Sequence, residues 1–274
     1  QASPVSGREE VRQWIPGLGV AYNVNDVFTL FTGVHRGFAP PRVEDVINNN
    51  TGQSIDLNSE LSWNYEAGFR GRITPDLQVE GAWFRMDFEN QIIPASVAGG
   101  VGATLTNGGR TLHQGAEFSG RWTTRVAPLA GRISLRGAYT YLPDASFQGL
   151  RFSTVTPTVR ITGNRLPYAP RNLLNASLHY FHNKGFNAMI ESVTTGRQFG
   201  DDLNTVNGTA DGQRGALPGN TMWNATANYP IEAWRTTLFV TAKNLTDRLV
   251  LVDRSRGMLP AMPRLVQAGF RFTF

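Results

Sequence analysis

The chain of 274 residues contains no cysteine and only two lysines, Lys184 and Lys243. The lack of cysteine excludes disulfide bonds, thiolate catalysis and cysteine-ligated metal sites. Because lysine is so scarce, the net charge of +5 and the isoelectric point near 9.9 come almost entirely from arginine. The arginines are scattered singly among acidic residues and glycines, whereas nucleic-acid-binding proteins gather basic residues on one surface. The sequence therefore disfavours a nucleic-acid partner.

Long apolar runs are also missing. No stretch approaches the roughly 18 consecutive apolar residues that a membrane-spanning helix requires, and no segment combines a 3.6-residue period with helix caps. The first residues, QASPVSGREEVRQW, are polar from the start and contain no signal peptide. We therefore expect an exported protein with this beginning to have been cleaved or truncated.

What the sequence does contain is strict alternation. Its final segment, RLVQAGFRFTF, places apolar side chains at every second position. A two-residue period predicts a β-strand with one apolar and one polar face. The apolar set is Val266, Ala268, Phe270, Phe272 and Phe274, and the other face carries Leu265, Gln267, Gly269, Arg271 and Thr273.

Further segments repeat this alternation, namely WNYEAGFRGRI (63–73), GAEFSGRWTT (115–124), ISLRGAYTY (133–141) and MWNATANY (222–229). Aromatic residues recur near the ends of their apolar faces, as in the girdles of a transmembrane β-barrel. A hydrophobic content of 41% and a mean hydropathy of −0.26 fit such a barrel, because its lumenal residues are polar. Polar lumenal and loop surfaces would also account for the positive charge.

The connections between the predicted strands are of two kinds. Short turns at 23–26, 74–76, 127–131, 182–185 and 230–234 alternate with long connections at roughly 40–59, 94–109, 143–166, 200–219 and 253–263. This asymmetry predicts an all-β fold, an antiparallel up-and-down transmembrane β-barrel with short periplasmic turns and long extracellular loops. We predict eleven strands, at about 14–24, 27–39, 60–73, 77–93, 110–125, 132–146, 167–181, 186–199, 220–230, 235–250 and 264–274.

Two features fit a closed barrel poorly. Within 77–93 the apolar residues change face, from Val79 and Trp83 to Phe84 and Met86, so we expect either a bulge or an upper half that stands clear of the membrane. Eleven is also an odd number, whereas bacterial single-chain barrels have even strand counts, and an open edge in lipid leaves backbone groups unpaired. We therefore expect the C-terminal half of a larger barrel, unless one strand has been missed.

Several segments resemble, in kind and in order, those of TonB-dependent outer-membrane receptors. They are GVHRGFAPPRVEDV (33–46), WNYEAGFRGRI (63–73), WFRMDFENQI (83–92), LHQGAEFSGRW (112–122), LPYAPRNLLNASLHY (166–180), TAKNLTDR (241–248) and the terminal FRFTF. The stretch FGDDLNTVNGTADGQRGALPGNTMWNATANY (199–229) is similar to the ferric citrate receptor branch of that family. The resemblance covers essentially the whole chain.

The resemblance implies a 22-stranded barrel occluded by an N-terminal plug, with an energy-coupling box that TonB contacts. Residues 1–274 would then be the C-terminal part of the barrel domain, without the plug and the N-terminal strands. Phe270, Phe272 and Phe274 would act as a signal for the barrel-assembly machinery. The implied protein is a multi-pass receptor of the Gram-negative outer membrane, surrounded by lipid and lipopolysaccharide. It would transport a ferric chelate, either a siderophore or ferric citrate. It would have no enzymatic activity and no cofactor, since iron enters only with the chelate.

The outer loops are the expected cargo site. Ferric citrate complexes are anionic, and arginine binds carboxylates in bidentate fashion. The candidates near outer strand ends or in long loops are Arg110, Arg197, Arg214, Arg254 and Arg256. Each of them could instead pair with a loop aspartate or a lipopolysaccharide phosphate. The ligand glutamine of the family would fall near Ser96, where this sequence departs from the pattern and reads IIPASVAGG (92–100).

A metal site finds less support. Oxygen donors occur together in DDLNTVNGTADG (201–212), but their spacing is not that of an EF-hand, and the same residue types form turns. The weak candidates are Asp201, Asp202, Asn204 and Asp211. The four histidines, His35, His113, His179 and His182, are too dispersed for a zinc site, and His113 is expected to be structural.

Three other classes of β-barrel remain as alternatives. An autotransporter translocator should begin with a lumenal helix, and none is evident. A barrel enzyme would need a histidine with a serine, or a pair of aspartates, at one rim, and the sequence offers no such set. A plain porin would lack the HRGFAPP and NLTDR segments.

Overall fold

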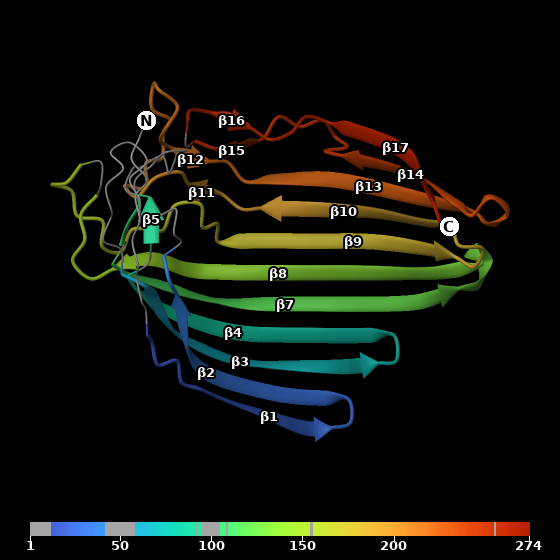
Figure 1. Ribbon diagram of the computed structural model, residues 1–274, viewed down its shortest axis with the longest axis horizontal. Coiled ribbons are helices and arrows are strands. Elements are labelled where there is room, and N and C mark those ends of the chain that lie inside the picture. The colour runs from blue at the N-terminus through green and yellow to red at the C-terminus, as the bar shows by residue number, and fades with distance from the viewer. Residues whose placement is uncertain are drawn as a thin grey trace.

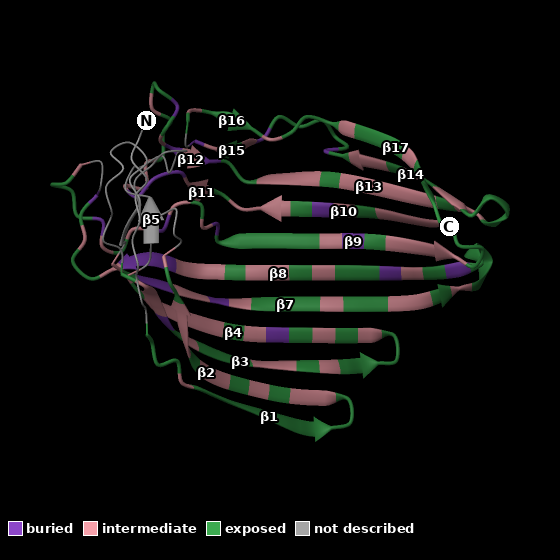
Figure 2. Ribbon diagram, viewed as in Figure 1, coloured by how far each residue is buried: buried purple, intermediate pink, exposed green. Residues whose placement is uncertain are grey.

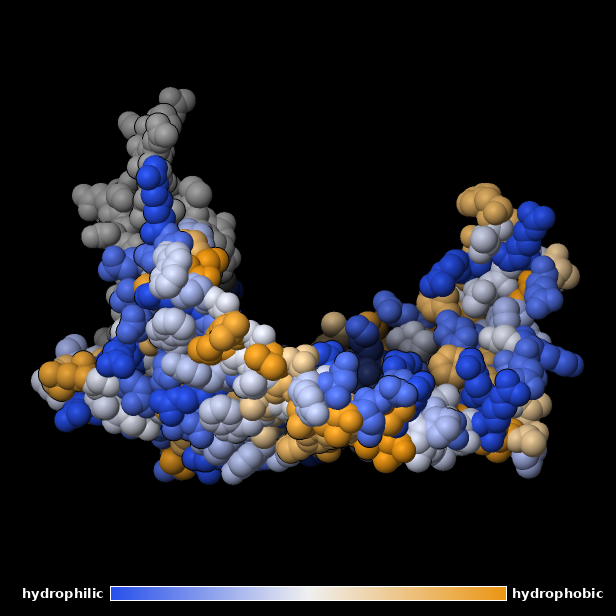
Figure 3. Space-filling view, turned by 90° about the horizontal axis from the view of Figure 1, so that it is seen from below, coloured by the Kyte–Doolittle hydropathy of each residue, from blue (hydrophilic) through white to orange (hydrophobic). Residues whose placement is uncertain are grey.

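The computed structural model describes residues 12–41, 58–90, 92–94, 105–107, 109–153, 156–254 and 256–274. Eleven long strands within these ranges form one antiparallel sheet, in the order β1-β2-β3-β4-β7-β8-β9-β10-β13-β14-β17. The sheet is curved and hollowed on one side (Figures 1 and 3). Its strands are β1 Gly17–Asn25, β2 Phe28–Ala39, β3 Glu60–Thr74, β4 Leu77–Glu89, β7 Arg110–Val126, β8 Gly131–Gln148, β9 Asn172–His182, β10 Asn187–Thr195, β13 Asn220–Ile231, β14 Thr236–Lys243 and β17 Leu265–Phe272.

The two ends of the sheet differ. Short turns join the strands at one end, and two of them contain the 3-10 helices η1 Ala127–Leu129 and η2 Glu232–Trp234 (Figure 1). The other end carries the long connections. Three two-stranded ladders lie there: β5 Ile92–Pro94 with β6 Leu105–Asn107, β11 Gln198–Phe199 with β12 Ala216–Leu217, and β15 Leu251–Asp253 with β16 Leu259–Pro260. No helix in the described part of the chain is long and apolar enough to cross a membrane.

The strand register separates apolar from polar side chains across the sheet. One row of directly opposed residues is Leu30, Phe69, Gly81, Phe118 and Tyr139. The neighbouring row, on the other face, is Thr29, Arg70, Glu80, Ser119 and Ala138. Thr29, Arg70, Glu80 and Ser119 line a groove in the hollow of the sheet, so we call this the inner face and the apolar one the outer face. Figure 2 shows the resulting alternation of exposure along the strands.

Within the described residues, no second layer of protein covers the outer face. Leu18 and Phe270 are each 73% exposed, and Phe118 and Leu135 are about half exposed. The buried hydrophobic cluster of the described residues is small and lies at the long-loop end, where Ala145 and Phe147 pack with Ile161 and Leu166. A sheet with exposed apolar side chains on one whole face, and polar ones in its hollow, matches the pattern of a transmembrane barrel wall.

The eleven predicted strands are confirmed, although several of their ends differ by three or more residues. The strand predicted at 77–93 ends at Glu89, and Asn90 has a φ of 56°. The strand predicted at 167–181 begins only at Asn172, after Tyr168 adopts a φ of 56°. The strand predicted at 186–199 ends at Thr195, and Gln198–Phe199 forms a separate short ladder. The strand predicted at 235–250 ends at Lys243, because Asn244 has a φ of 48° and turns the chain. In each case a loop interaction overrides a strand-like sequence.

The bulge that was one of two expectations for 77–93 is not found in the described part of that segment. The register of β4 with β7 is continuous from Leu77 to Phe88, and with β3 it is irregular only beside the turn at Thr74. A bulge lies instead between β7 and β8, where the register shifts between Gln114 and Ala116. Phe84 and Met86 face inward opposite Glu66 and Asn64, so the apolar residues of β4 change face while the backbone remains regular.

Candidate functional site

Three of the long connections, at 149–171, 196–219 and 244–264, interlock into one loop assembly. The backbone N–H of Arg165 donates to Asn204 Oδ1, and Asn204 Nδ2 donates back to the Arg165 carbonyl, both at 2.8 Å. The hydroxyl of Tyr168 donates to Asp253 Oδ1 at 2.8 Å and accepts from the backbone N–H of Arg254 at 3.2 Å. These paired bonds hold the loops against one another without a disulfide.

Arg165 anchors the assembly to the sheet. Its guanidinium donates to the carbonyls of Leu142, Pro143 and Ala169 at 2.6 to 3.0 Å, and Arg171 adds a second bond to Pro143 at 2.8 Å. Leu142 and Pro143 are the residues of β8 that lie in the bulge, so their carbonyls have no regular ladder partner. Burial lowers the pKa of Arg165, and the charge of Arg171 lowers it further.

Asn244 also anchors the loop assembly to the sheet, at the point where β14 ends. Asn244 is 1% exposed and therefore fully buried. Nδ2 donates to the carbonyls of Arg248 and Met262, and Oδ1 accepts from the N–H of Arg248, all at 3.0 Å. The backbone N–H of Asn244 donates to Asn224 Oδ1 on β13 at 3.0 Å. One asparagine therefore ties the start of the last long loop to its end and to the sheet.

The oxygen donors considered as a metal site are used by the loop itself. Asp201 is fully buried, and its carboxylate accepts from the N–H groups of Leu203, Thr205 and Gly215. Asp202 accepts from the Ser153 hydroxyl at 3.0 Å. Asp211 is exposed, and bonds from the Thr209 hydroxyl and the Gln213 N–H lower its pKa. Within the described residues no group of three or more His, Asp or Glu side chains is placed to hold a metal ion.

The structure brings four of the five candidate arginines to the loop assembly. Arg197 and Arg214 each precede a strand of the β11/β12 ladder, and Arg254 and Arg256 follow β15. Arg197 and Arg256 are exposed and Arg214 is half-buried. Arg254 is 7% exposed, and its guanidinium donates to the carbonyls of Gly212 and Ala216, so it holds the 196–219 connection to the 244–264 connection.

Arg110 lies apart from the other four. It begins β7 on the same face as Phe118, which is the outer face. There it borders a hollow of about 410 Å³ together with Trp63, Arg85 and Asp87. Arg85 and Asp87 form a salt bridge at 2.8 Å, directly above the apolar part of β4. The outer face therefore turns from apolar to charged before the strands end.

Arg151 and Arg160 belong to the loop assembly and, like Arg165 and Arg171, were not among the arginines predicted from the sequence. Arg151 and Arg160 flank the tip of the 149–162 segment, where Phe152 and Arg160 form a β-bridge. Arg151 lies 5.1 Å from the Phe147 ring, and burial lowers its pKa. Arg160 Nε donates to Thr162 Oγ1 at 3.1 Å. The only sequence signal for them was the presence of arginines in a long connection.

The three phenylalanines predicted as an assembly signal lie at the short-turn end of the last strand. Phe270, Phe272 and Phe274 follow one another on the outer face and are 73%, 50% and 103% exposed, with the rings of Phe272 and Phe274 edge to face at 5.2 Å. Ser96, near which the family's ligand glutamine would fall, lies outside the described residues.

The chain matches one family model and is similar in fold to several solved structures. The family model described as TonB dependent receptor-like, beta-barrel matches residues 2–245. The fold is similar to the unliganded ferric citrate transporter FecA, with a TM-score of 0.69, 22% identity, and coverage of 93% of this chain and 37% of that chain.

It is also similar to the siderophore receptor PirA from Acinetobacter baumannii, with a TM-score of 0.68, 19% identity, and coverage of 96% and 41%. The FrpB iron transporter from Neisseria meningitidis (F3-3 variant) gives a TM-score of 0.68, 15% identity, and coverage of 95% and 38%. The chain thus spans 37% to 41% of the length of these structures.

Proposed function

Because this chain belongs to the TonB dependent receptor-like β-barrel family, we propose that it is the C-terminal part of the barrel of an outer-membrane receptor. The receptor takes up a ferric chelate, a siderophore or ferric citrate, with energy delivered through TonB. The observation that carries the proposal is the curved eleven-stranded sheet, with its apolar outer face and polar inner face; all of its strands except β17 lie within the family match.

The two edges of the sheet support the assignment to part of a barrel. In the described residues β1 pairs only with β2, and β17 only with β14. An unpaired strand edge in hydrocarbon costs several kcal/mol for each N–H or C=O group without a partner. Both edges therefore need further strands, which the remaining length of the similar solved structures could supply. The plug and the contact with TonB would lie in the same remaining part.

The loop assembly is proposed as one wall of the chelate site. It presents Arg197, Arg214 and Arg256 on loops that are already held in place, so little conformational entropy is lost when an anionic chelate binds. Arg254 would support this wall from within, and Arg110 would face the outer leaflet. The protein would do no covalent chemistry on its cargo and would need no cofactor. Its iron would arrive and leave within the chelate.

The proposal includes two further partners. The barrel-assembly machinery would bind the exposed Phe270, Phe272 and Phe274. The outer face of the sheet would contact outer-membrane lipid, and its charged part near the long-loop end would contact lipopolysaccharide. Charged residues at that level, including Arg85 and Asp87, fit a headgroup region better than hydrocarbon.

The test is iron-limited growth of a strain without other receptors of its kind, carrying the full-length protein and supplied with a panel of ferric chelates. We expect growth on at least one anionic chelate. When Arg197 and Arg214 are both changed to alanine, the apparent dissociation constant of that chelate for the receptor should rise. Arg132→Ala, at the short-turn end, is the matched control and should bind like the wild type. If the receptor is present in the outer membrane but supports growth on none of the chelates, the proposal is wrong.

A further inference from the structure

One exposed asparagine of the loop assembly is followed directly by glycine. Asn207 and Gly208 lie in the 196–219 connection, and both are exposed. The sequence contains a second Asn–Gly pair, Asn107 and Gly108, but Gly108 lies outside the described residues. In such a pair the backbone nitrogen of the glycine can attack the amide carbon of the asparagine side chain, because glycine has no Cβ atom to block the approach. The surroundings of the pair decide whether this reaction takes place.

The backbone on either side of Asn207 and Gly208 is held, while the reacting groups are free. Val206 and Thr209 each form a backbone hydrogen bond of 3.2 Å with the facing segment 214–216. Within the described residues, neither the side chain of Asn207 nor the N–H of Gly208 makes a hydrogen bond. The amide carbon and the nitrogen therefore need not leave a partner before they react.

A second glycine keeps the nitrogen of Gly208 accessible. Gly215 faces the pair with a φ of 121°, and a Cβ atom at this position would lie 3.0 Å from the Gly208 nitrogen. Because Gly215 has no side chain, room remains beside the nitrogen for the five-membered ring that the reaction forms.

Arg254 supplies a positive charge next to the same nitrogen. A Cβ atom built on Gly208 would lie 3.5 Å from Arg254 Nη2 and 3.7 Å from Nη1. Arg254 is 7% exposed, and its Nε has no hydrogen-bond partner in the described structure. A nearby positive charge favours loss of a proton from the Gly208 nitrogen, and it stabilises the oxyanion that forms when the amide carbon is attacked.

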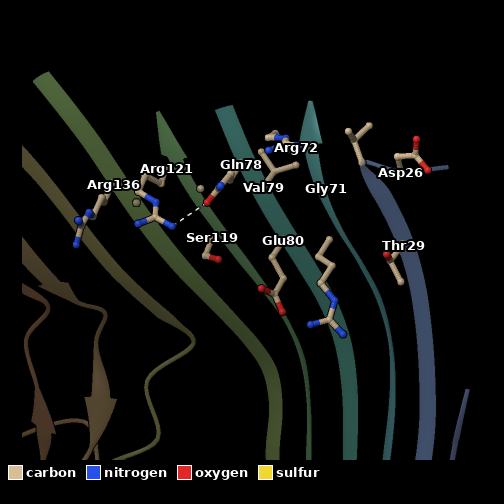
Figure 4. Close-up of a pocket in the computed structure, with 14 residues that line it drawn as sticks. Asp26, Thr29, Gly71, Arg72, Gln78, Val79, Glu80, Ser119, Arg121 and Arg136 are labelled. Carbon is tan, nitrogen blue, oxygen red and sulfur yellow. Dashed lines mark hydrogen bonds between the residues drawn. The ribbon is translucent and has the colours of Figure 1, made fainter. Parts of the chain in front are cut away.

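Arginine by itself does not create such a site. The groove of about 640 Å³ on the inner face also gathers guanidinium groups, and there Arg121 lies directly opposite Arg136 (Figure 4). No asparagine lines that groove. Within the described residues, a guanidinium meets an Asn–Gly pair only in the loop assembly.

We propose that Asn207 is a self-modifying site, which the receptor slowly converts to aspartate or isoaspartate. The nitrogen of Gly208 forms a bond to Cγ of Asn207, the bond from Cγ to Nδ2 breaks, and ammonia leaves with the proton of the nitrogen. Water then opens the cyclic imide at either carbonyl and gives aspartate or isoaspartate. One water is consumed and one ammonia is released, and the reaction involves no oxidant or reductant.

The modification changes the charge of the loop assembly. A neutral amide becomes a carboxylate on the connection that carries Arg197 and Arg214, one residue from the glycine that lies against Arg254. Each conversion lowers the positive charge of this wall by one unit, so an anionic chelate is bound less tightly. This consequence rests on the proposed function, whereas the modification itself does not.

The test is peptide mass spectrometry of the full-length receptor, purified from outer membranes and incubated in a mildly alkaline buffer. Trypsin cleaves after Arg197 and Arg214, so one peptide, 198–214, contains both Asn204 and Asn207. Fragmentation of this peptide locates the mass shift of deamidation at one asparagine or the other, and it distinguishes aspartate from isoaspartate.

Two controls are built into the same loop. Asn204 is followed by threonine, and its side chain is hydrogen-bonded to both backbone groups of Arg165. The matched variant is Gly208→Ala, which keeps Asn207 and adds a Cβ atom at an ordinary contact distance of 3.5 Å from Arg254.

We expect Asn207 to convert with time to aspartate and isoaspartate, Asn204 to stay unchanged, and the conversion to be largely lost in Gly208→Ala. Three results would overturn the proposal: Asn207 intact in the folded receptor, conversion of Asn204 at the same rate, or unchanged conversion in Gly208→Ala. If that variant does not assemble, the comparison of Asn207 with Asn204 in the wild type still decides. Because the readout is a mass, a receptor that converts Asn207 but supports no iron-limited growth would separate this proposal from the proposed function.

Discussion

The hydroxyl group of Tyr168 donates a hydrogen bond of 2.8 Å to Asp253, although the two residues are 85 positions apart in the chain. The same oxygen accepts from the backbone N–H of Arg254, whose side chain in turn holds the 196–219 connection. The phenol therefore joins the 149–171 connection to the 244–264 connection, and the Arg254 side chain extends this link to the third. Specific hydrogen bonds therefore hold the loop assembly together, and its stability should depend on a few side chains.

Removal of the proton from Tyr168 should loosen the loops at high pH. Burial, helped by the bond to Asp253, raises the pKa of Tyr168 from 10.0 to about 12. Because the folded loops hold this proton more tightly than the unfolded chain does, its contribution to stability is full below pH 10 and is lost as the pH rises through about 12. Protease protection of the loops should fall over that window in the wild type. Tyr168→Phe should lack this step, and Tyr22→Phe, on the outer face of β1, should behave like the wild type.

Asn244→Ala should free the last long connection. It removes the bonds to the carbonyls of Arg248 and Met262, and each buried group left without a partner costs about 1–3 kcal/mol. Amide hydrogen exchange within 244–264 should accelerate, while exchange in β4 stays unchanged. The matched control is Asn207→Ala, since Asn207 is exposed and its side chain makes no hydrogen bond in the described structure. Equal exchange in the two variants would contradict the role assigned to Asn244.

Gly115→Ala should disrupt the bulge between β7 and β8. A Cβ atom there would lie 2.4 Å from the Tyr141 carbonyl oxygen, whereas at Gly120, on the same strand, the nearest atom would be 3.6 Å away. Overpacking of this kind typically costs about 1–3 kcal/mol. The urea midpoint of the purified receptor should therefore fall for Gly115→Ala and stay near the wild-type value for Gly120→Ala. A similar loss in both would show that the close approach at the bulge is not the cause.

Phe118→Arg should prevent membrane assembly and Ser119→Arg should not. Phe118 is half exposed on the outer face, where an arginine near the bilayer midplane costs roughly 2–4 kcal/mol. Ser119 is the next residue, lies on the inner face and stands opposite Glu80. The amount of receptor in purified outer membranes is the measurement. If both variants assemble equally well, the outer face is not in contact with lipid. Ser134 would be a poor control, because it is buried and accepts a bond from the Thr123 hydroxyl.

The amino-acid sequence was enough to predict the number of long strands, the two faces of the sheet and the division into short turns and long connections. These properties depend on local periodicity, which WNYEAGFRGRI and the terminal FRFTF display without help from distant residues. The family followed from the same segments, and the family match confirms it. The sequence also showed that the apolar residues of β4 change from one face to the other. The register showed that they do so without a bulge in the described strand.

The contacts of the individual polar residues could be assigned only from the folded chain. Arg254 and Arg197 look alike in sequence, but one is enclosed by the carbonyls of a neighbouring loop and the other is exposed. The opposition of Arg121 and Arg136 arises from the register of β7 with β8 across the η1 turn. Tyr168 and Asp253 lie on two different loops, which come together only in the folded structure. Hydrogen bonds and charge contacts between residues far apart in the chain leave no period in the sequence, so these roles could not be read from it.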